Sequence, residues 1–185
     1  AASMQWIIDL VFPPRDDERI VRGTDASDFT GLLSPALAPV TGPATTFLLP
    51  YRDERVRAAI HETKYHASSE ARALLAEVLT QYLMETEAIG QPIIIPIPMS
   101  AARTQKRGEN HVEHIVEKAL RSFGSDLPYL LRPELLIRTH ERPAQVTLSR
   151  VERLVNMHDA FTASTSLDPT RTYIVIDDVI TTGAT

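Results

Sequence analysis

The stretch YIVIDDVITTGAT, residues 173–185, joins an apolar run to two acids and a threonine-rich turn. The run Tyr173–Ile176 is short, aromatic and β-branched, which predicts a buried strand. Asp177 and Asp178 follow it directly. The turn after them carries its hydroxyl groups and a glycine at Thr181, Thr182, Gly183 and Thr185. Acids and hydroxyls gathered where a strand ends indicate a ligand site at the edge of a sheet.

The two halves of this stretch suit two parts of one ligand. Hydroxyl and backbone N–H groups around a glycine bind phosphate oxygens, and a helix that begins there adds its positive end. Carboxylates accept hydrogen bonds from sugar hydroxyls and can help to hold Mg²⁺ through them. A phosphorylated ribose satisfies both halves, with its hydroxyls on Asp177 and Asp178 and its 5′-phosphate on the turn.

Helical and strand patterns alternate along the rest of the chain. Apolar residues at helical spacing predict helices over 56–63, 71–83, 112–120 and 146–155. Short apolar runs predict strands at 93–98, 135–137 and 173–176. This order predicts an α/β fold in which helices cover a parallel sheet on both faces and ligands bind at the carboxyl ends of the strands.

The first part of the chain has a different character. Residues 4–50 show weak periodicity and carry prolines at 13, 14, 35, 39, 43 and 50. This pattern predicts a small irregular arm or hood of short strands and turns, followed by the main domain over residues 51–185. We expect the arm to pack on the main domain through Trp6, Ile7, Val11, Phe12 and Leu32.

Composition excludes several classes of protein. A net charge of −5, from 24 acidic and 19 basic residues, excludes a surface that binds nucleic acid broadly, although a local basic cleft is compatible with it. The chain has no cysteine, so it has neither disulfides nor a thiolate zinc site. No apolar stretch reaches the roughly 18 residues of a membrane span. We therefore expect a soluble, cytoplasmic protein.

The closing stretch resembles the PRPP-binding motif of type I phosphoribosyltransferases, which has four apolar residues, two acids and then Thr-Thr-Gly-x-Thr. Four further segments are similar to the ComF-type competence proteins of that family. They are LVFPPR (10–15), AIHETKYHAS (59–68), IPIPMSAARTQKRGEN (95–110) and RTHERPAQVTLSRVERLVNMHDAF (138–161). The resemblance covers nearly the whole chain and implies a phosphoribosyltransferase-like sheet.

The resemblance also implies roles for particular residues. It places Asp177 and Asp178 at the ribose, as the catalytic pair. It assigns the 5′-phosphate to Thr181, Thr182, Gly183, Ala184 and Thr185. Its candidates for pyrophosphate binding are Lys64, Arg103, Arg107, Arg138 and Arg142. Mg²⁺ is expected to arrive with PRPP and to have no direct protein ligand.

Simpler explanations exist for several of these residues. A loop arginine is more often part of a solvated surface than a ligand contact. Lys64 also suits the C-terminal end of a helix, where the helix dipole favours a positive charge. The two acids can merely cap a strand and stabilise the turn. His111 and His114 have metal-ligand spacing, but no third ligand accompanies them.

The chain departs from the family in three places. Members usually carry a Cys-x-x-Cys zinc ribbon after the Phe-Pro-Pro stretch, where Asp16, Asp17 and Glu18 stand here, so we expect no zinc. Glu109 and His111 occupy positions where Phe and Gln are usual. The chain ends within the phosphate turn, where the family has a further helix and strands, so we expect the domain to be incomplete at its C-terminus.

Two classes of function follow from the resemblance. One is a Mg²⁺-dependent enzyme that transfers the phosphoribosyl group between pyrophosphate and a base or amine. The alternative is a non-catalytic PRPP or nucleotide binder that serves competence and DNA uptake through a partner protein. No motif identifies the acceptor or a general base, and homo-oligomerisation stays open.

Overall fold

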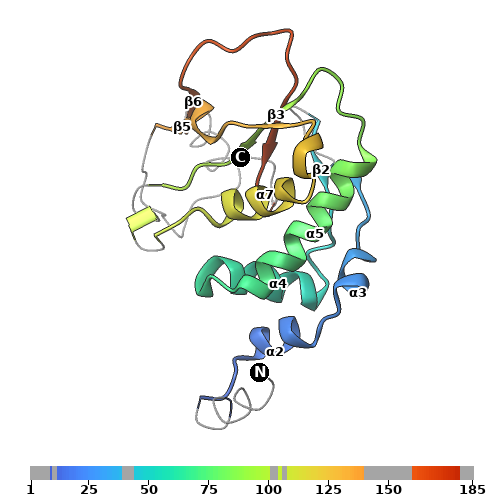
Figure 1. Ribbon diagram of the computed structural model, residues 1–185. Coiled ribbons are helices and arrows are strands. Elements are labelled where there is room, and N and C mark those ends of the chain that lie inside the picture. Colours follow the sequence, from blue (N-terminus) through green and yellow to red (C-terminus); the bar gives the residue numbers. More distant parts are fainter. Residues whose placement is uncertain are drawn as a thin grey trace.

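The computed structural model describes residues 9, 12–38, 44–100, 104–105, 108–139 and 160–179. These residues form a mixed α/β fold in which a small parallel sheet of three strands lies beside a group of helices (Figure 1). The predicted α/β class and the parallel sheet are therefore confirmed. None of the helices in this part of the chain combines the length and apolar composition needed to cross a bilayer.

The described helices are α2 (Asp16–Gly23), α3 (Ala26–Thr30), α4 (Glu54–His66), α5 (Ser69–Glu85) and α7 (His111–Arg121), with 3-10 turns η1 (Gly124–Asp126) and η2 (Pro133–Leu135). The strands are β1 (Ala36–Leu37), β2 (Thr46–Phe47), β3 (Ile93–Pro96), β4 (Leu130–Leu131), β5 (Leu136–Arg138), β6 (Phe161–Ala163) and β7 (Tyr173–Ile176). The helices predicted at 56–63, 71–83 and 112–120 are confirmed as α4, α5 and α7. The predicted helix at 146–155 lies outside the described residues.

The parallel sheet has the strand order β4-β3-β7. Ile93 lies opposite Tyr173 and Pro96 lies opposite Ile176, so β3 and β7 end side by side. The backbone N–H of Ile97 continues this pairing by donating to the carbonyl of Ile176 at 2.8 Å. Both strands therefore deliver the residues that follow them to the same edge of the sheet.

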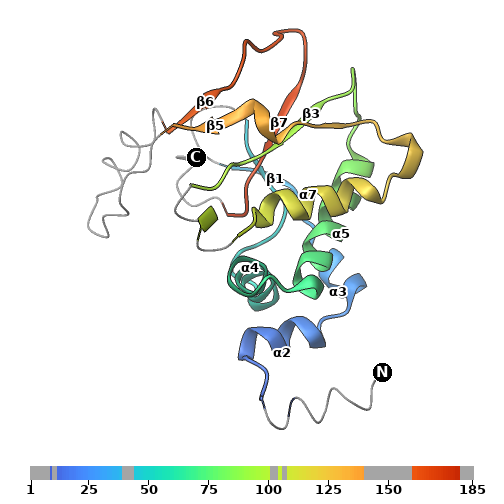
Figure 2. The same cartoon turned by 60° about the vertical axis from the view of Figure 1, so that its left-hand side comes forward.

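The strand predicted near 135–137 is present as β5, but it does not join the parallel sheet. It pairs antiparallel with β6, and Arg138 lies opposite Phe161. In Figures 1 and 2 this β5–β6 pair lies across the sheet from helices α4 and α5. The structure thus has a separate two-stranded element beside the sheet.

Capping residues define the helices next to the sheet. The side chain of Asp53 accepts from the N–H of Arg55 at 2.9 Å and begins α4. The hydroxyl of Ser68 accepts from the N–H of Ala71 at 3.2 Å and begins α5. Between them Ala67 is left-handed, with φ of 50°, and reverses the chain.

Helix α5 supplies side chains to both hydrophobic cores. Ala71, Leu74 and Val78 pack with buried residues of α2, α3 and α4. A second set of α5 residues packs with β3, α7 and the buried Tyr129, and it consists of Ala76, Leu79 and Leu83. Two faces of one helix therefore connect the first part of the chain to the sheet.

The prediction of helices on both faces of the sheet is not met by the described residues. Ile174 and Ile176 of β7 pack toward the core formed by α5 and α7. Val175, between them, is 52% exposed. Helices α4, α5 and α7 lie on the same side of the sheet in both views (Figures 1 and 2). Alternating residues of β7 therefore face the helical core and solvent, whereas all four residues of the central strand β3 are buried.

The prediction that the N-terminal arm is irregular is wrong for residues 16–30, which form α2 and α3. Its periodicity is weak because α2 is mostly charged, with acids in its first turn and only Ile20 and Val21 on the core. The short strands expected in the arm are confirmed as the antiparallel pair β1–β2. The boundary at residue 50 stays a prediction.

The side chains that attach the arm are only partly those predicted. Leu32 packs against the core as expected, but Phe12 is 73% exposed, so its predicted contact is wrong. Val21 and Phe29 are buried instead, because α2 and α3 turn these side chains toward α4 and α5. Trp6, Ile7 and Val11 lie outside the described residues.

Candidate functional site

The two acids after β7 lie at the carboxyl edge of the parallel sheet. Asp177 follows β7 directly, next to the segment that leaves β3, because Ile97 and Ile176 are hydrogen bonded. The Asp177 carboxylate accepts the backbone N–H of Asp178 at 2.8 Å. This contact fixes the backbone at the strand end and leaves Asp177 exposed while Asp178 turns inward.

The carboxylate of Asp178 contacts the side chains of both Lys64 and His111. Its Oδ2 atom lies 2.7 Å from Nζ of Lys64 and 2.6 Å from Nε2 of His111. The side chains of Asp178, Lys64 and His111 are 12%, 22% and 8% exposed, so this contact is mostly shielded from water. The site therefore joins three elements, the end of β7, the last turn of α4 and the first residue of α7.

The residue before His111 positions the start of α7. Asn110 caps the helix, and its side-chain oxygen accepts from the N–H of Val112 at 3.1 Å. Its side-chain nitrogen donates to the carbonyl of Ile97 at 3.0 Å. One amide thus fastens the helix to the segment leaving β3, which sets His111 at the same sheet edge as Asp178.

Glu109 forms a second set of contacts that fixes the residues just before α7. Glu109 accepts from the guanidinium of Arg72 on α5 and lies 2.9 Å from Nε2 of His114. The other ring nitrogen of His114 is 3.3 Å from Glu117. Glu109 therefore anchors this segment to α5 through Arg72 and to α7 through His114.

The two acids differ in their electrostatics. Desolvation opposes ionisation of Asp178, but hydrogen bonds from His111 and Lys64 prevail and lower its pKa from 3.8 to about 2. The pKa of Asp177 is raised, chiefly by desolvation from surrounding protein atoms and further by the charge of Asp178. Asp178 is therefore a fixed negative charge, and Asp177 is the more readily protonated member of the pair.

His111 carries an unusual feature. Because ionised Asp178 can only accept, Nε2–H of His111 is the donor in their contact. The other ring nitrogen, Nδ1, is buried and has no hydrogen-bond partner among the described residues. A buried unpaired nitrogen costs about 1–3 kcal/mol, so the contact with Asp178 has to outweigh that cost.

The remaining oxygens of the acid pair can bind a ligand. Among the described residues, the Asp178 bonds use only Oδ2, and the Asp177 bond uses only Oδ1. Each carboxylate thus keeps one oxygen as an acceptor. Two adjacent acceptors suit a pair of hydroxyl groups on one small molecule.

A groove of about 830 Å³ opens at the same edge of the sheet. Met99, Ser100 and Thr104 line it from the segment after β3. Leu136, Ile137 and Arg138 line it from β5. Its size and its mixture of apolar walls with a few polar groups suit a small molecule.

The structure brings Lys64, Asp177 and Asp178 together, as the sequence predicts for a single site. Arg138 lies apart from them at the groove, where its guanidinium carbon is 5.1 Å from the centre of the Phe161 ring. The other candidates lie outside the described residues and are Arg103, Arg107, Arg142, Thr181, Thr182, Gly183, Ala184 and Thr185.

Sequence reasoning missed His111 as a partner of Asp178 and weighed it only as a metal ligand. Its one signal is its position as the first residue of a helix that follows a strand and loop, which places it near the carboxyl edge of the sheet. The sequence separation of 67 residues gives no further indication of this contact.

Comparison with known proteins adds nothing to this geometry, since no protein-family model, curated protein or solved structure matches the chain significantly. The function proposed below therefore rests on the residues of the site and on the resemblance of its motifs.

Proposed function

We propose that this chain binds PRPP, or another ligand carrying ribose 5-phosphate, and transfers the phosphoribosyl group between pyrophosphate and an acceptor. The observation that supports it best is the acid pair at the carboxyl edge of a parallel sheet, where the described residues occupy only one oxygen of each carboxylate. Such a pair suits the two ribose hydroxyls. The resemblance of the sequence motif to PRPP sites supports the same ligand.

Each residue has a distinct role in this proposal. Cleavage of the anomeric C–O bond builds positive charge on the sugar, and the fixed charge of Asp178 favours that charge electrostatically. Asp177, at the exposed rim, accepts from a ribose hydroxyl. Lys64 is already held at Asp178, and pyrophosphate oxygens would compete for its ammonium group.

The acids fit a magnesium ion that arrives with the substrate. Oδ2 of Asp178 already has two partners, so direct coordination through that oxygen would compete with Lys64 and His111. Contact through sugar hydroxyls keeps both partners in place. Bound in this way, Mg²⁺ would offset the charge of the pyrophosphate.

The groove beside the acids is proposed to receive the acceptor. It is lined by Pro98, which follows β3 at the carboxyl edge of the sheet, and it extends to β5. Arg138 adds a positive charge to its wall, which would attract an anionic acceptor or the leaving pyrophosphate.

Calorimetry with PRPP and Mg²⁺ tests the binding step. Asp177→Asn is the informative variant because Asp177 is exposed and its removal leaves the Lys64–Asp178–His111 contact intact. We expect its affinity for PRPP to fall at least tenfold, which corresponds to about 1.4 kcal/mol of a charge-assisted hydrogen bond. Asp168→Asn is the matched control, since Asp168 precedes β7 at the opposite edge and is also exposed.

An assay for pyrophosphate release across nucleobases and amines tests the transfer step. Turnover with any acceptor supports the enzyme. PRPP binding without turnover would instead support the alternative of a non-catalytic PRPP binder. Absence of PRPP binding, or an equal loss in the Asp168 control, would refute the assignment of the site.

A further inference from the structure

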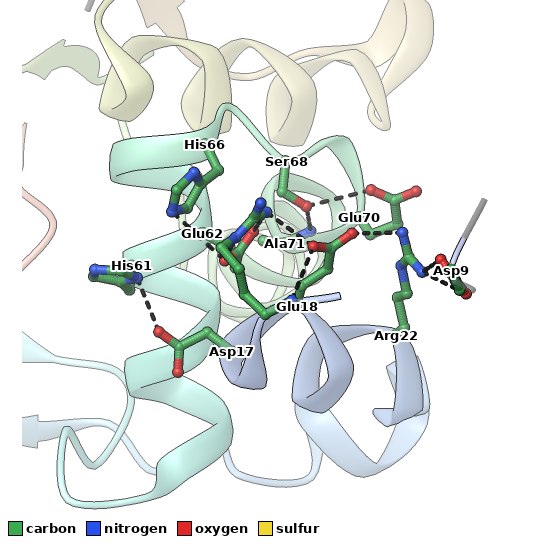
Figure 3. A network of polar contacts seen from close by, with 11 residues as sticks. Asp9, Asp17, Glu18, Arg22, His61, Glu62, His66, Ser68, Glu70 and Ala71 are labelled. Atoms are coloured by element: carbon green, nitrogen blue, oxygen red, sulfur yellow. Dashed lines mark hydrogen bonds and ion pairs between the residues drawn. The ribbon is translucent and has the colours of Figure 1, made fainter. Parts of the chain in front are cut away.

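A second polar cluster, which includes neither acid of the pair, lies where α2 packs on α4 (Figure 3). Its members are Asp9, Arg15, Asp17, Glu18, Arg22, His61, Glu62, His66, Ser68 and Glu70. Five carboxylates face two guanidinium groups, so with neutral imidazoles the cluster has an excess of negative charge. Such an excess of negative charge favours a bound cation.

Glu62 is the centre of this cluster. It is 1% exposed, and its two oxygens accept from Nε and Nη2 of Arg15 at 3.0 and 2.8 Å. These hydrogen bonds are the main reason that the pKa of Glu62 is lowered, against the opposing effect of desolvation. Glu62 also lies in the last turns of α4, where the helix end favours positive charge. A second cation beside Glu62 would therefore be stabilised.

Two histidines of α4 lie beside this carboxylate. Nε2 of His66 is 4.0 Å from Oε1 of Glu62, too far for a hydrogen bond. Donor atoms of His61, Glu62 and His66 all lie within 4.8 Å of one another. Ligands of a tetrahedral zinc ion lie roughly 3.4 Å apart, given metal–ligand distances near 2.1 Å. Small side-chain rotations would therefore bring these three atoms around one ion.

We propose that His61, Glu62 and His66 bind a divalent transition-metal ion of the zinc class. Two imidazoles and one carboxylate form a donor set that zinc accepts readily, whereas magnesium prefers oxygen ligands. The expectation of no zinc rests on the missing thiolates and a resemblance, and this site uses nitrogen and oxygen donors from a different part of the chain. The proposal is independent of PRPP binding.

Arg15 is compatible with this ion. Each carboxylate oxygen has two lone pairs, and Arg15 occupies one on each oxygen of Glu62, which leaves a lone pair of Oε1 for a metal. Arg15 is 49% exposed, so water screens its repulsion of the ion. A carboxylate oxygen of Asp17 lies 2.8 Å from Nδ1 of His61. Asp17 can therefore orient the imidazole ring, or replace it as a ligand of the metal ion.

The surroundings leave room for the remaining ligand. A cavity of about 150 Å³ borders Glu62 and His66 and is also lined by Arg15, Glu18, Val21, Arg22, Ser68 and Glu70. Polar walls and this volume admit water molecules. A three-ligand protein site completed by water is a common arrangement for zinc.

Calorimetry of the chelator-treated full chain with Zn²⁺, and absorption spectroscopy with Co²⁺, test the site. We expect one equivalent to bind and both His61→Gln and His66→Gln to weaken the affinity at least tenfold. His114→Gln is the matched control, because its ring also faces two carboxylates but belongs to α7. Its metal affinity is expected to match that of the unmodified chain.

Thermal unfolding with Zn²⁺ gives a second measurement. The metal is expected to raise the Tm of the unmodified chain and to lose this effect in both α4 variants. His61 and His66 are exposed, so the variants are expected to stay folded. The proposal is overturned if the unmodified chain binds no stoichiometric Zn²⁺, or if His114→Gln weakens binding as much as the α4 variants do.

Discussion

Replacing Asp178 with Asn tests the electrostatic centre of the candidate site. Oδ2 of Asp178 receives Lys64 and His111, and asparagine can offer one acceptor oxygen but no charge. If the amide NH₂ group of asparagine faced Lys64 or His111, two donors would meet and no hydrogen bond could form. Lys64, at 22% exposed, can turn toward water, but His111, at 8%, is confined. The loss is therefore expected to arise mainly at His111.

The size of this loss follows from the ionisation of Asp178. Its pKa is lowered from 3.8 to about 2. A difference of one in pKa corresponds to about 1.4 kcal/mol, so the folded state favours the ionised carboxyl by roughly 2.5 kcal/mol. We expect Asp178→Asn to lower the free energy of unfolding at pH 7 by about 2–3 kcal/mol. This figure includes the cost of leaving Lys64 and His111 without their charged partner.

Urea unfolding at several pH values measures this effect. A carboxyl group with a depressed folded pKa stabilises the fold above its unfolded pKa, and the contribution disappears as pH falls through the folded value. The difference in free energy of unfolding between the unmodified chain and Asp178→Asn is therefore expected to reach its full value above about pH 5 and to shrink as pH falls toward 2. Equal stabilities at pH 7, or a difference that persists at pH 3 undiminished, would refute this account of the contact.

Three further substitutions test the fold by urea unfolding. Arg15→Met is expected to cost about 2–3 kcal/mol, below the 3–5 typical of a broken buried pair because Arg15 is 49% exposed, and unchanged stability would show that solvent screens Glu62. Tyr129→Phe removes a hydrogen bond of 2.8 Å to the carbonyl of Leu83 and is expected to cost about 1–2 kcal/mol; a neutral result would mean that this bond adds nothing to stability. Ala67→Gly is expected to stabilise by about 0.5–1 kcal/mol because φ is 50° at this exposed residue, and a loss would contradict the assignment of backbone strain there.

The sequence predicts the long elements of the fold well. Apolar spacing over many residues identifies α4, α5 and α7, and β-branched runs identify β3 and β7. β4 and β6 have two and three residues, which is too short for a period to show. α2 lacks an apolar stripe because ion pairs cover most of it, so its helical character is hidden in the pattern.

The candidate site is predictable only where its residues belong to one stretch. Asp177 and Asp178 are recognisable because strand and acids are consecutive, and Lys64 is suggested by resemblance. His111 meets Asp178 only because α7 begins at the edge where β7 ends, which is a property of the packed sheet. Glu62 looks like a surface residue of α4 in sequence, but α2 covers it and supplies Arg15.

Helix α5 determines how the molecule can come apart. Leu74 faces the core that holds α2 to α4, and Leu79 faces the core beneath β3. Separating either core from α5 exposes apolar surface of that helix to water. Neither core can therefore stay buried when the other one comes apart. Unfolding of the described helices and sheet is therefore expected to be a single cooperative transition, with the amide hydrogens in the middle of α5 exchanging only when the whole unit opens.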